Sequence, residues 1–171
     1  MMWKYTGQVR PPFAEAPGPG QESVWDYPRP PALEKVAARV EVYVGERCIA
    51  ASDAAYRVLE TASPPSIYVP AEMVDLRAFA PCGHQTFCEW KGVASYYQLA
   101  TAVDGPVVAW RYDNPVERFR PIDGAISFYP GRLACFWNGE RVTPQPGEFY
   151  GGWMTSNIAG PVKGGPGTAG W

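Results

Sequence analysis

The sequence lacks several motifs that would assign a function directly. No two of its four cysteines are spaced as C-x-x-C, and it has a single histidine. Paired C-x-x-C zinc knuckles are therefore excluded. The sequence also has no D-x-D and no G-x-x-x-x-G-K-[ST] motif, and the Gly-rich run near its C-terminal end has no helix pattern behind it. Enzymes that transfer nucleotides need carboxylates for a divalent metal and a Gly-rich or basic element for the triphosphate. The residues therefore give no support to nucleotidyl transfer, and we expect neither a metal nor another cofactor.

The sequence has no block of basic residues and no long apolar run. Its 15 Lys and Arg against 17 Asp and Glu give a net charge of −2, so a nucleic-acid partner is not expected. No apolar stretch approaches the length of a membrane span, and the first residues, MMWKYTGQVRPPF, lack the apolar core of a signal peptide. We therefore expect a cytoplasmic protein without a membrane partner. In that compartment its cysteines are reduced and mostly act as small buried hydrophobes: Cys48, Cys82, Cys88 and Cys135.

Glycine, proline and aromatic residues are abundant instead. The 171 residues include 18 Gly, 19 Pro, 7 Trp, 10 Tyr and 7 Phe, a composition that favours many short strands and turns over long helices. We predict a mainly β protein, a single compact β-barrel- or β-tent-like domain of short antiparallel strands and hairpins with at most one or two short helices. Residues 1–35 form a Pro/Gly-rich arm, residues 36–143 the β domain, and residues 144–171 a second arm that packs on the domain.

Turn residues divide the predicted domain into strands. Residues 40–44 alternate and are followed by Gly45-Glu46, which predicts a hairpin with residues 47–50. Asn138-Gly139 is the strongest two-residue turn signal in the chain. Further strands are predicted at 56–61, 66–69 and 107–112, one or two helical turns at 71–79, and a second hairpin in which 124–129 and 133–137 flank Pro130-Gly131-Arg132.

The aromatic stretch CEWKGVASYY, residues 88–97, is the centre of the functional prediction. We interpret it as a strand, a tight turn at Gly92 and a second strand, after a loop through residues 82–84. Side chains alternate along a strand, so Glu89 and Lys91 share one face and Cys88 and Trp90 share the other. Opposite charges on one side of an aromatic hairpin form either a surface pair or the polar floor of a pocket.

Together these segments resemble domain-of-unknown-function family four-twenty-seven, a group of mainly bacterial proteins that also carries a nucleotidyltransferase label. The residues that carry the resemblance are RVEVYVGERCIAAS, RVLETASPPSIYVP, TFCEWKGVASYY, VAWRYDNP and ISFYPGRLACFWNGERV, and both flanks look like the longer members. The resemblance implies a compact β fold similar to the β-tents of the Mss-four class. Many of those relatives hold zinc between paired C-x-x-C knuckles, which this chain lacks, so the metal is not carried over.

A cluster of charged and aromatic side chains on these strands predicts a small-molecule pocket. Lys91 and Arg57 would orient a carboxylate or phosphate, and Glu60 would accept a hydrogen bond from a hydroxyl or amine. The alternative is a set of ordinary ion pairs with packed tyrosines. The remaining candidates for ligand binding are Tyr68, Glu89, Trp90, Tyr96, Trp110, Tyr112 and Tyr129. Phe128 and Trp137 complete a possible aromatic cage, for which core packing is the alternative.

Two cysteine-based sites are weaker predictions. Cys82, His84 and Cys88 supply three zinc ligands, with Cys135 or Cys48 as a fourth, but their spacing matches no common knuckle. Cys88 is also a candidate nucleophile, because the neighbouring Lys91 would lower its thiol pKa.

Three functions follow from these predictions. The first is a module that binds a small organic ligand. The second is an enzyme in which Glu60 acts as acid or base and Lys91 or Tyr68 stabilises developing charge, so that Glu60→Gln abolishes turnover but leaves affinity within about tenfold. The third is an interaction protein, such as a homodimer joined by its arms, in which removal of residues 1–22 changes the oligomeric state.

Overall fold

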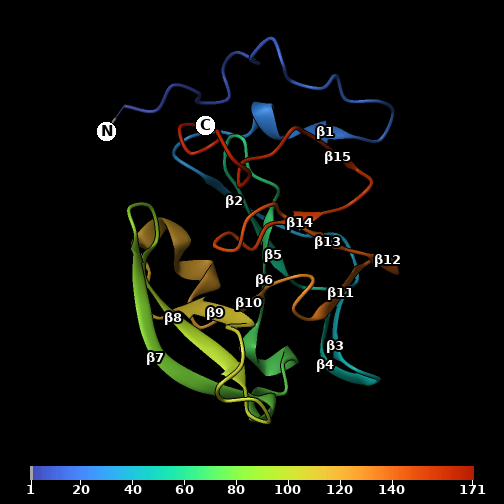
Figure 1. The fold of residues 1–171 in the computed structure, drawn as a ribbon, viewed down its shortest axis with the longest axis vertical. Helices are drawn as coiled ribbons and strands as arrows, with labels where there is room; N and C mark the ends of the chain where they lie inside the picture. The colour runs from blue at the N-terminus through green and yellow to red at the C-terminus, as the bar shows by residue number, and fades with distance from the viewer. Residues whose placement is uncertain (1) are drawn as a thin grey trace.

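The computed structural model describes residues 2–171 as strands joined by turns and short 3-10 helices (Figure 1). The helices are η1 (Val24–Asp26), η2 (Ala71–Met73), η3 (Leu76–Ala78) and η4 (Glu117–Ile122). The strands are β1 (Glu22–Ser23), β2 (Ala32–Lys35), β3 (Val40–Val44), β4 (Arg47–Ser52), β5 (Tyr56–Leu59), β6 (Ser66–Val69), β7 (Phe79–Cys88), β8 (Gly92–Leu99), β9 (Ala109–Tyr112), β10 (Ile126–Phe128), β11 (Ala134–Trp137), β12 (Glu140–Arg141), β13 (Thr143–Pro144), β14 (Trp153–Met154) and β15 (Ile158–Ala159). None of the helices described is long and apolar enough to cross a membrane.

Two antiparallel sheets enclose the main core. One sheet has seven strands in the order β2-β5-β6-β10-β9-β8-β7, and the other has four in the order β12-β11-β3-β4. Alternation turns β-branched and aromatic side chains of both sheets inward, among them Val42, Ile49, Ile67 and Phe128. The mainly β prediction is therefore confirmed. In residues 2–171 the strands form separate open sheets, so no closed barrel is found.

The hairpins with local turn signals form as predicted. β3 pairs with β4 around Gly45, whose φ of 59° requires the left-handed region. Asn138 and Gly139 have φ values of 48° and 80° and join β11 to β12, as a type I′ turn requires. The predicted strand at 56–61 is β5, which pairs with β2 and β6. The predicted helical turns at 71–79 are the short helices η2 and η3.

The central hairpin differs from its prediction. Residues 82–84 are part of the long strand β7, and the pairing register with β8 shifts between Pro81 and Gln85. Such a bulge absorbs extra residues while pairing continues on both sides. Cys88 pairs with Gly92, so the three residues 89–91 form the turn and their side chains do not alternate as in a strand.

The hairpin predicted around Pro130-Gly131-Arg132 is wrong. β10 lies inside the seven-stranded sheet, paired with β6 on one edge and β9 on the other. β11 pairs instead with β3 and β12. Because both edges of β10 are occupied, the chain crosses from one sheet to the other at this turn, where Gly131 has a φ of 91°.

The two terminal segments, residues 2–35 and 144–171, meet at one end of the molecule, at the top of Figure 1. β1 and β15 pair in parallel, with Glu22 opposite Ile158. Trp25 is fully buried among the aromatic rings of Tyr5, Phe13 and Trp171, which come from both segments. The centroid of the Trp25 ring lies 5.2–5.3 Å from those of the other three rings, and the Phe13 and Trp171 rings lie 5.0 Å apart. The terminal segments thus share a small core of their own.

Candidate functional site

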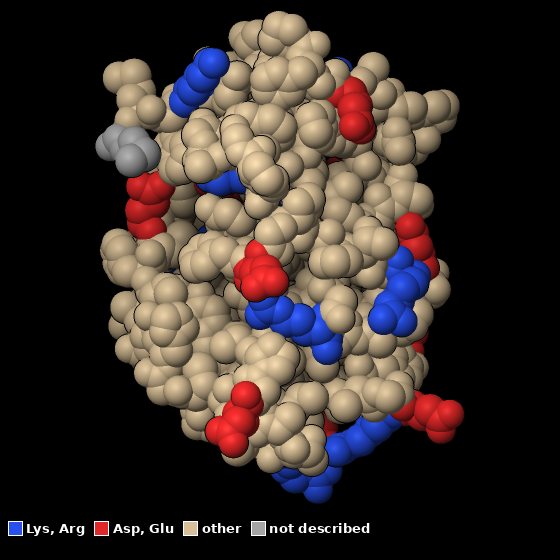
Figure 2. Space-filling view, viewed as in Figure 1, with Lys and Arg blue, Asp and Glu red and all other residues tan. Residues whose placement is uncertain are grey.

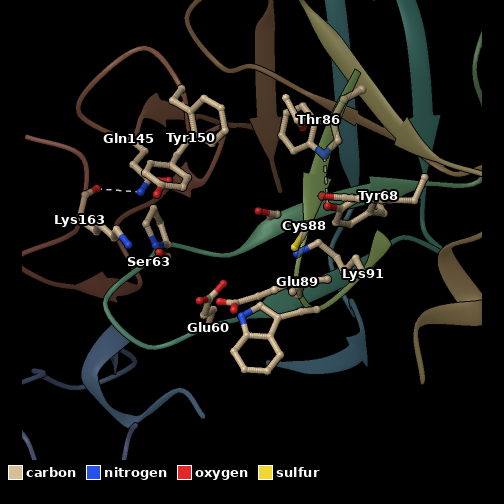
Figure 3. Close-up of a pocket in the computed structure, with 18 of the residues that line it drawn as sticks. Glu60, Ser63, Tyr68, Thr86, Cys88, Glu89, Lys91, Gln145, Tyr150 and Lys163 are labelled. Atoms are coloured by element: carbon tan, nitrogen blue, oxygen red, sulfur yellow. Dashed lines mark hydrogen bonds between the residues drawn. The ribbon is translucent and has the colours of Figure 1, made fainter. Parts of the chain in front are cut away.

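A cavity of about 390 Å³ lies between the seven-stranded sheet and the terminal segments (Figure 3). The residues that line it from the seven-stranded sheet and the turns between its strands, including the turn 89–91, form what we call the sheet wall. The residues from both terminal segments that line it form the arm wall. The sheet wall includes Val58, Glu60, Ser66, Tyr68, Thr86, Cys88, Glu89, Trp90, Lys91, Tyr96, Trp110 and Tyr112, and Tyr129 follows β10. The arm wall consists of Trp3, Gln145, Phe149, Tyr150, Gly151 and Lys163.

Strand register builds the aromatic part of the sheet wall. Tyr96 is paired with Trp110, Trp110 with Ser127, and Ser127 with Tyr68, so these side chains form one row on one face of the sheet. The small Ser127 leaves room for Trp110 and Tyr68 to meet, with Trp110 Nε1 donating to the Tyr68 hydroxyl at 3.2 Å. Tyr112 lies two residues after Trp110 and therefore faces the same side.

Burial favours the protonated form of three tyrosines beside the cavity. It raises the pKa of Tyr68, Tyr112 and Tyr129 above the ordinary tyrosine value. The Tyr129 hydroxyl donates to the Phe149 carbonyl oxygen at 3.0 Å, and the Tyr96 and Thr86 hydroxyls are hydrogen-bonded at 2.7 Å. The wall therefore presents flat rings whose polar ends can donate hydrogen bonds.

A buried arginine holds the carboxylate of the sheet wall in place. Arg29 Nε lies 3.0 Å from Glu60 Oε1, and the Arg29 side chain is only 2% exposed. The same guanidinium donates at 3.0 Å to main-chain oxygens of Tyr5, Thr61 and Trp171. Arg29 thus joins both terminal segments to the residue that follows β5.

The arm wall approaches the sheet through two glycines. A Cβ on Gly151 would lie 2.5 Å from Trp110 Cζ3, and one on Gly152 would lie 2.5 Å from Gln145 Oε1. The buried Gln145 amide donates to the Lys163 carbonyl oxygen at 2.7 Å and accepts from Gly152 N at 3.1 Å. These contacts place Lys163 and Tyr150 opposite the sheet wall (Figure 3).

The two lysines that line the cavity have different surroundings. Lys163 Nζ lies 3.4 Å from the main-chain oxygen of Trp171 and over the rings of Trp3 and Tyr150 at 4.8 and 5.4 Å. Burial and the nearby Arg29 lower the pKa of Lys163. Lys91 Nζ lies 5.5 and 5.8 Å from the ring centres of Tyr112 and Phe119. Figure 2 shows basic atoms inside a hollow with acidic atoms at its edge.

Of the residues predicted for the small-molecule pocket, all except Arg57 line the cavity. Alternation turns Arg57 to the other face of β5, where its guanidinium pairs with Glu22 and Glu34. Phe128 and Trp137 also lie elsewhere, Phe128 within the main core and Trp137 packed against it. Sequence reasoning missed the arm wall, whose only local signal is a Gly-Gly pair beside aromatic residues.

The cysteines do not gather around His84. Its exposed ring packs on Tyr96 at a centroid distance of 5.1 Å. Among residues 2–171 no group of three or more His, Cys, Asp and Glu side chains is placed to hold a metal ion. Only Cys135 is buried, and burial raises its thiol pKa to about 12, whereas Cys48 is exposed. Cys88 lines the cavity.

Comparison with protein families gives one result. A family model described as "Domain of unknown function (DUF427)", with the name NTP_transf_9, matches residues 32–139. The chain belongs to this family. The match begins with β2 and ends in the turn after β11, so it includes the sheet wall but not the arm wall of the cavity. No curated protein matches the sequence.

Proposed function

We propose that this DUF427 protein binds a small organic ligand with a flat, ring-containing body. The observation that carries the proposal is the row of Tyr96, Trp110 and Tyr68, which faces a cavity of about 390 Å³. Ligand pockets are typically about 300–1,000 Å³ and combine apolar or aromatic walls with a few polar groups. Rings stacked on these side chains would bury the ligand body, and the charged residues at the cavity would orient it.

Binding is favoured over the acid–base enzyme by the state of the proposed catalytic groups. Glu60 is engaged by Arg29 through an ion pair of 3.0 Å. Burial raises the pKa of Tyr68, whose hydroxyl already accepts from Trp110 Nε1. These arrangements suit fixed recognition groups better than groups that exchange protons during turnover.

Protection of Cys88 from alkylation tests the proposal. Six probes form three matched pairs: benzoate and benzamide, indole-3-acetate and indole-3-acetamide, and 1-naphthoate and 1-naphthamide. We expect at least one of them to slow the reaction of Cys88 with iodoacetamide, measured by peptide mass spectrometry. The exposed Cys48 in the same molecule is the internal control, and its rate stays unchanged.

A cavity-filling variant locates the effect. Ser66 lines the cavity two residues before Tyr68, on the same face of β6. Ser66→Trp would occupy the space of the ligand and abolish protection of Cys88. Protection that persists in Ser66→Trp, or its absence with all six probes in the wild type, would refute the proposed function.

A further inference from the structure

Lys91 stands out among the charged groups of the cavity because it has no polar partner. Its residue is only 8% exposed and lines the cavity. Within residues 2–171 its amine makes no hydrogen bond and no ion pair. The only groups that face its charge are the rings of Tyr112 and Phe119, whose centres lie 5.5 and 5.8 Å from Nζ. Those distances lie at the outer limit for cation–π attraction, and neither ring supplies an acceptor.

The position of Lys91 is fixed by its main chain. It is the last residue of the turn between β7 and β8, and its carbonyl oxygen accepts from Val116 N at 3.1 Å. The neighbouring Gly92 is paired with Cys88 and has a φ of 114°. The side chain therefore reaches inward from an anchored turn, toward Cys88 and Glu89 (Figure 3).

The two carboxylates at the cavity are engaged elsewhere. Glu60 pairs with Arg29 at 3.0 Å, and Glu89 accepts from Trp3 Nε1 at 3.2 Å. Lys163, by contrast, has the main-chain oxygen of Trp171 and two rings around it. An ammonium carries three donors, and in a largely buried cavity an anionic acceptor would stabilise it. Of the two lysines, Lys91 is the one that still needs an anionic partner.

We infer that Lys91 binds a carboxylate of the ligand while the neighbouring aromatic row holds the ligand body. This inference rests on the proposed function. Two lysines and two glutamates line the cavity, and Arg29 pairs with Glu60, so these five groups carry a formal charge of +1. A singly charged carboxylate would bring this charge to zero, whereas a doubly charged phosphate would leave an excess negative charge close to Glu60 and Glu89. The expected ligand class is thus a small aromatic or heteroaromatic monocarboxylic acid.

The acid and amide of each matched pair test the inference, because they share a shape and differ in charge. We expect the wild-type protein to bind the acids at least about tenfold more tightly than the amides, as for a hydrogen bond between charged groups. Affinities come from isothermal titration calorimetry. Phenyl phosphate is measured beside benzoate, and tighter binding of phenyl phosphate would overturn the monocarboxylate assignment.

Lysine variants locate the charge recognition. Lys91→Met should reduce the acid preference to within about twofold while amide binding persists, and Lys91→Gln should do the same. Removing a buried charge without a partner should not lower the melting temperature, which serves as the folding check. Lys163→Met should reduce the acid preference less than Lys91→Met does, and the exposed Lys35→Met should match the wild type in every measurement.

The outcomes separate the two proposals. If none of the probes binds, the proposed function fails. If acids and amides bind equally to the wild type, the cavity is a binding site but Lys91 does not recognise a carboxylate. An acid preference lost in Lys163→Met and kept in Lys91→Met would also overturn the inference.

Discussion

The two walls of the cavity are held in place by different means. In the sheet wall, main-chain pairing of β6, β10, β9 and β8 fixes Tyr68, Trp110 and Tyr96 in one row. In the arm wall there is no such ladder: isolated main-chain bonds, such as Lys163 N to the Ala62 oxygen, act together with a few side chains, chiefly Arg29 and Gln145, and with the small size of Gly151. The sheet wall lies within residues 32–139 of the family match and the arm wall lies outside it. We therefore expect the sheet wall to tolerate single changes that displace the arm wall.

The largest effect should come from Arg29→Met, which removes the anchor of the arm wall. The change leaves Glu60 without its cation and several main-chain oxygens without a donor. Breaking a buried ion pair in this way costs about 3 kcal/mol, measured as the free energy of unfolding in urea. Arg10→Met is the matched control, because its pair with Asp26 is 44% and 50% exposed and contributes little to stability. Equal losses in the two variants would contradict the comparison.

A smaller effect is expected from Gly151→Ala, at the closest approach of the walls. The added Cβ would overlap the Trp110 ring, so the arm wall must move outward. Overpacking of this kind costs about 1–3 kcal/mol. Gly170→Ala, in the same terminal segment, meets nothing within 4 Å and should change the free energy of unfolding by less than about 0.5 kcal/mol. Trp110 fluorescence should respond only in Gly151→Ala; an unchanged spectrum would mean that the walls do not meet as described.

This difference also explains how much could be predicted from the sequence. The sheet wall follows from alternation and turn signals, which are local, and residues such as Lys91 and Trp110 could be selected from their aromatic surroundings. The arm wall depends on contacts such as Trp3 with Glu89 and Arg29 with Trp171. These join residues far apart in sequence, and no local pattern predicts them.

Two errors show where local reasoning fails even within the sheet. Alternation along a strand at residues 56–61 places Arg57 and Glu60 on opposite faces, whereas the pocket prediction joined them in one site because of their charges. The outward pairs with Glu22 and Glu34 show that alternation was the better guide. A turn at residues 130–132 was predicted correctly, but a turn signal does not reveal that both edges of β10 are already paired.

A pH-dependent prediction concerns the link between the arm strand β1 and the outer face of the sheet. Burial opposes the charged form of Glu22, but hydrogen bonds from Arg57 and Tyr27 outweigh it and lower the Glu22 pKa. A lowered folded-state pKa stabilises the protein above the unfolded value, near pH 4.5, and this stability is lost as the pH falls through the folded pKa. Glu22→Gln should therefore lose less stability than the wild type between pH 7 and pH 3, by under about 1 kcal/mol in urea unfolding. Glu46→Gln, at an exposed position, should follow the wild-type curve. Identical curves for all three proteins would mean that Glu22 does not stabilise the contact between β1 and the sheet.

The smallest effect is expected at Ser127, in the middle of the aromatic row. Its Oγ is buried and has no hydrogen-bond partner among residues 2–171, so Ser127→Ala removes a polar atom whose desolvation is not repaid by any bond. The variant should be neutral or more stable by up to about 1 kcal/mol, and it keeps the small volume that lets Trp110 reach Tyr68. Ser127→Val, by contrast, fills that space and should break the Trp110–Tyr68 hydrogen bond and weaken binding of the naphthalene probes. If Ser127→Ala instead lost stability comparable to Gly151→Ala, the sheet wall would depend on single side chains just as the arm wall does.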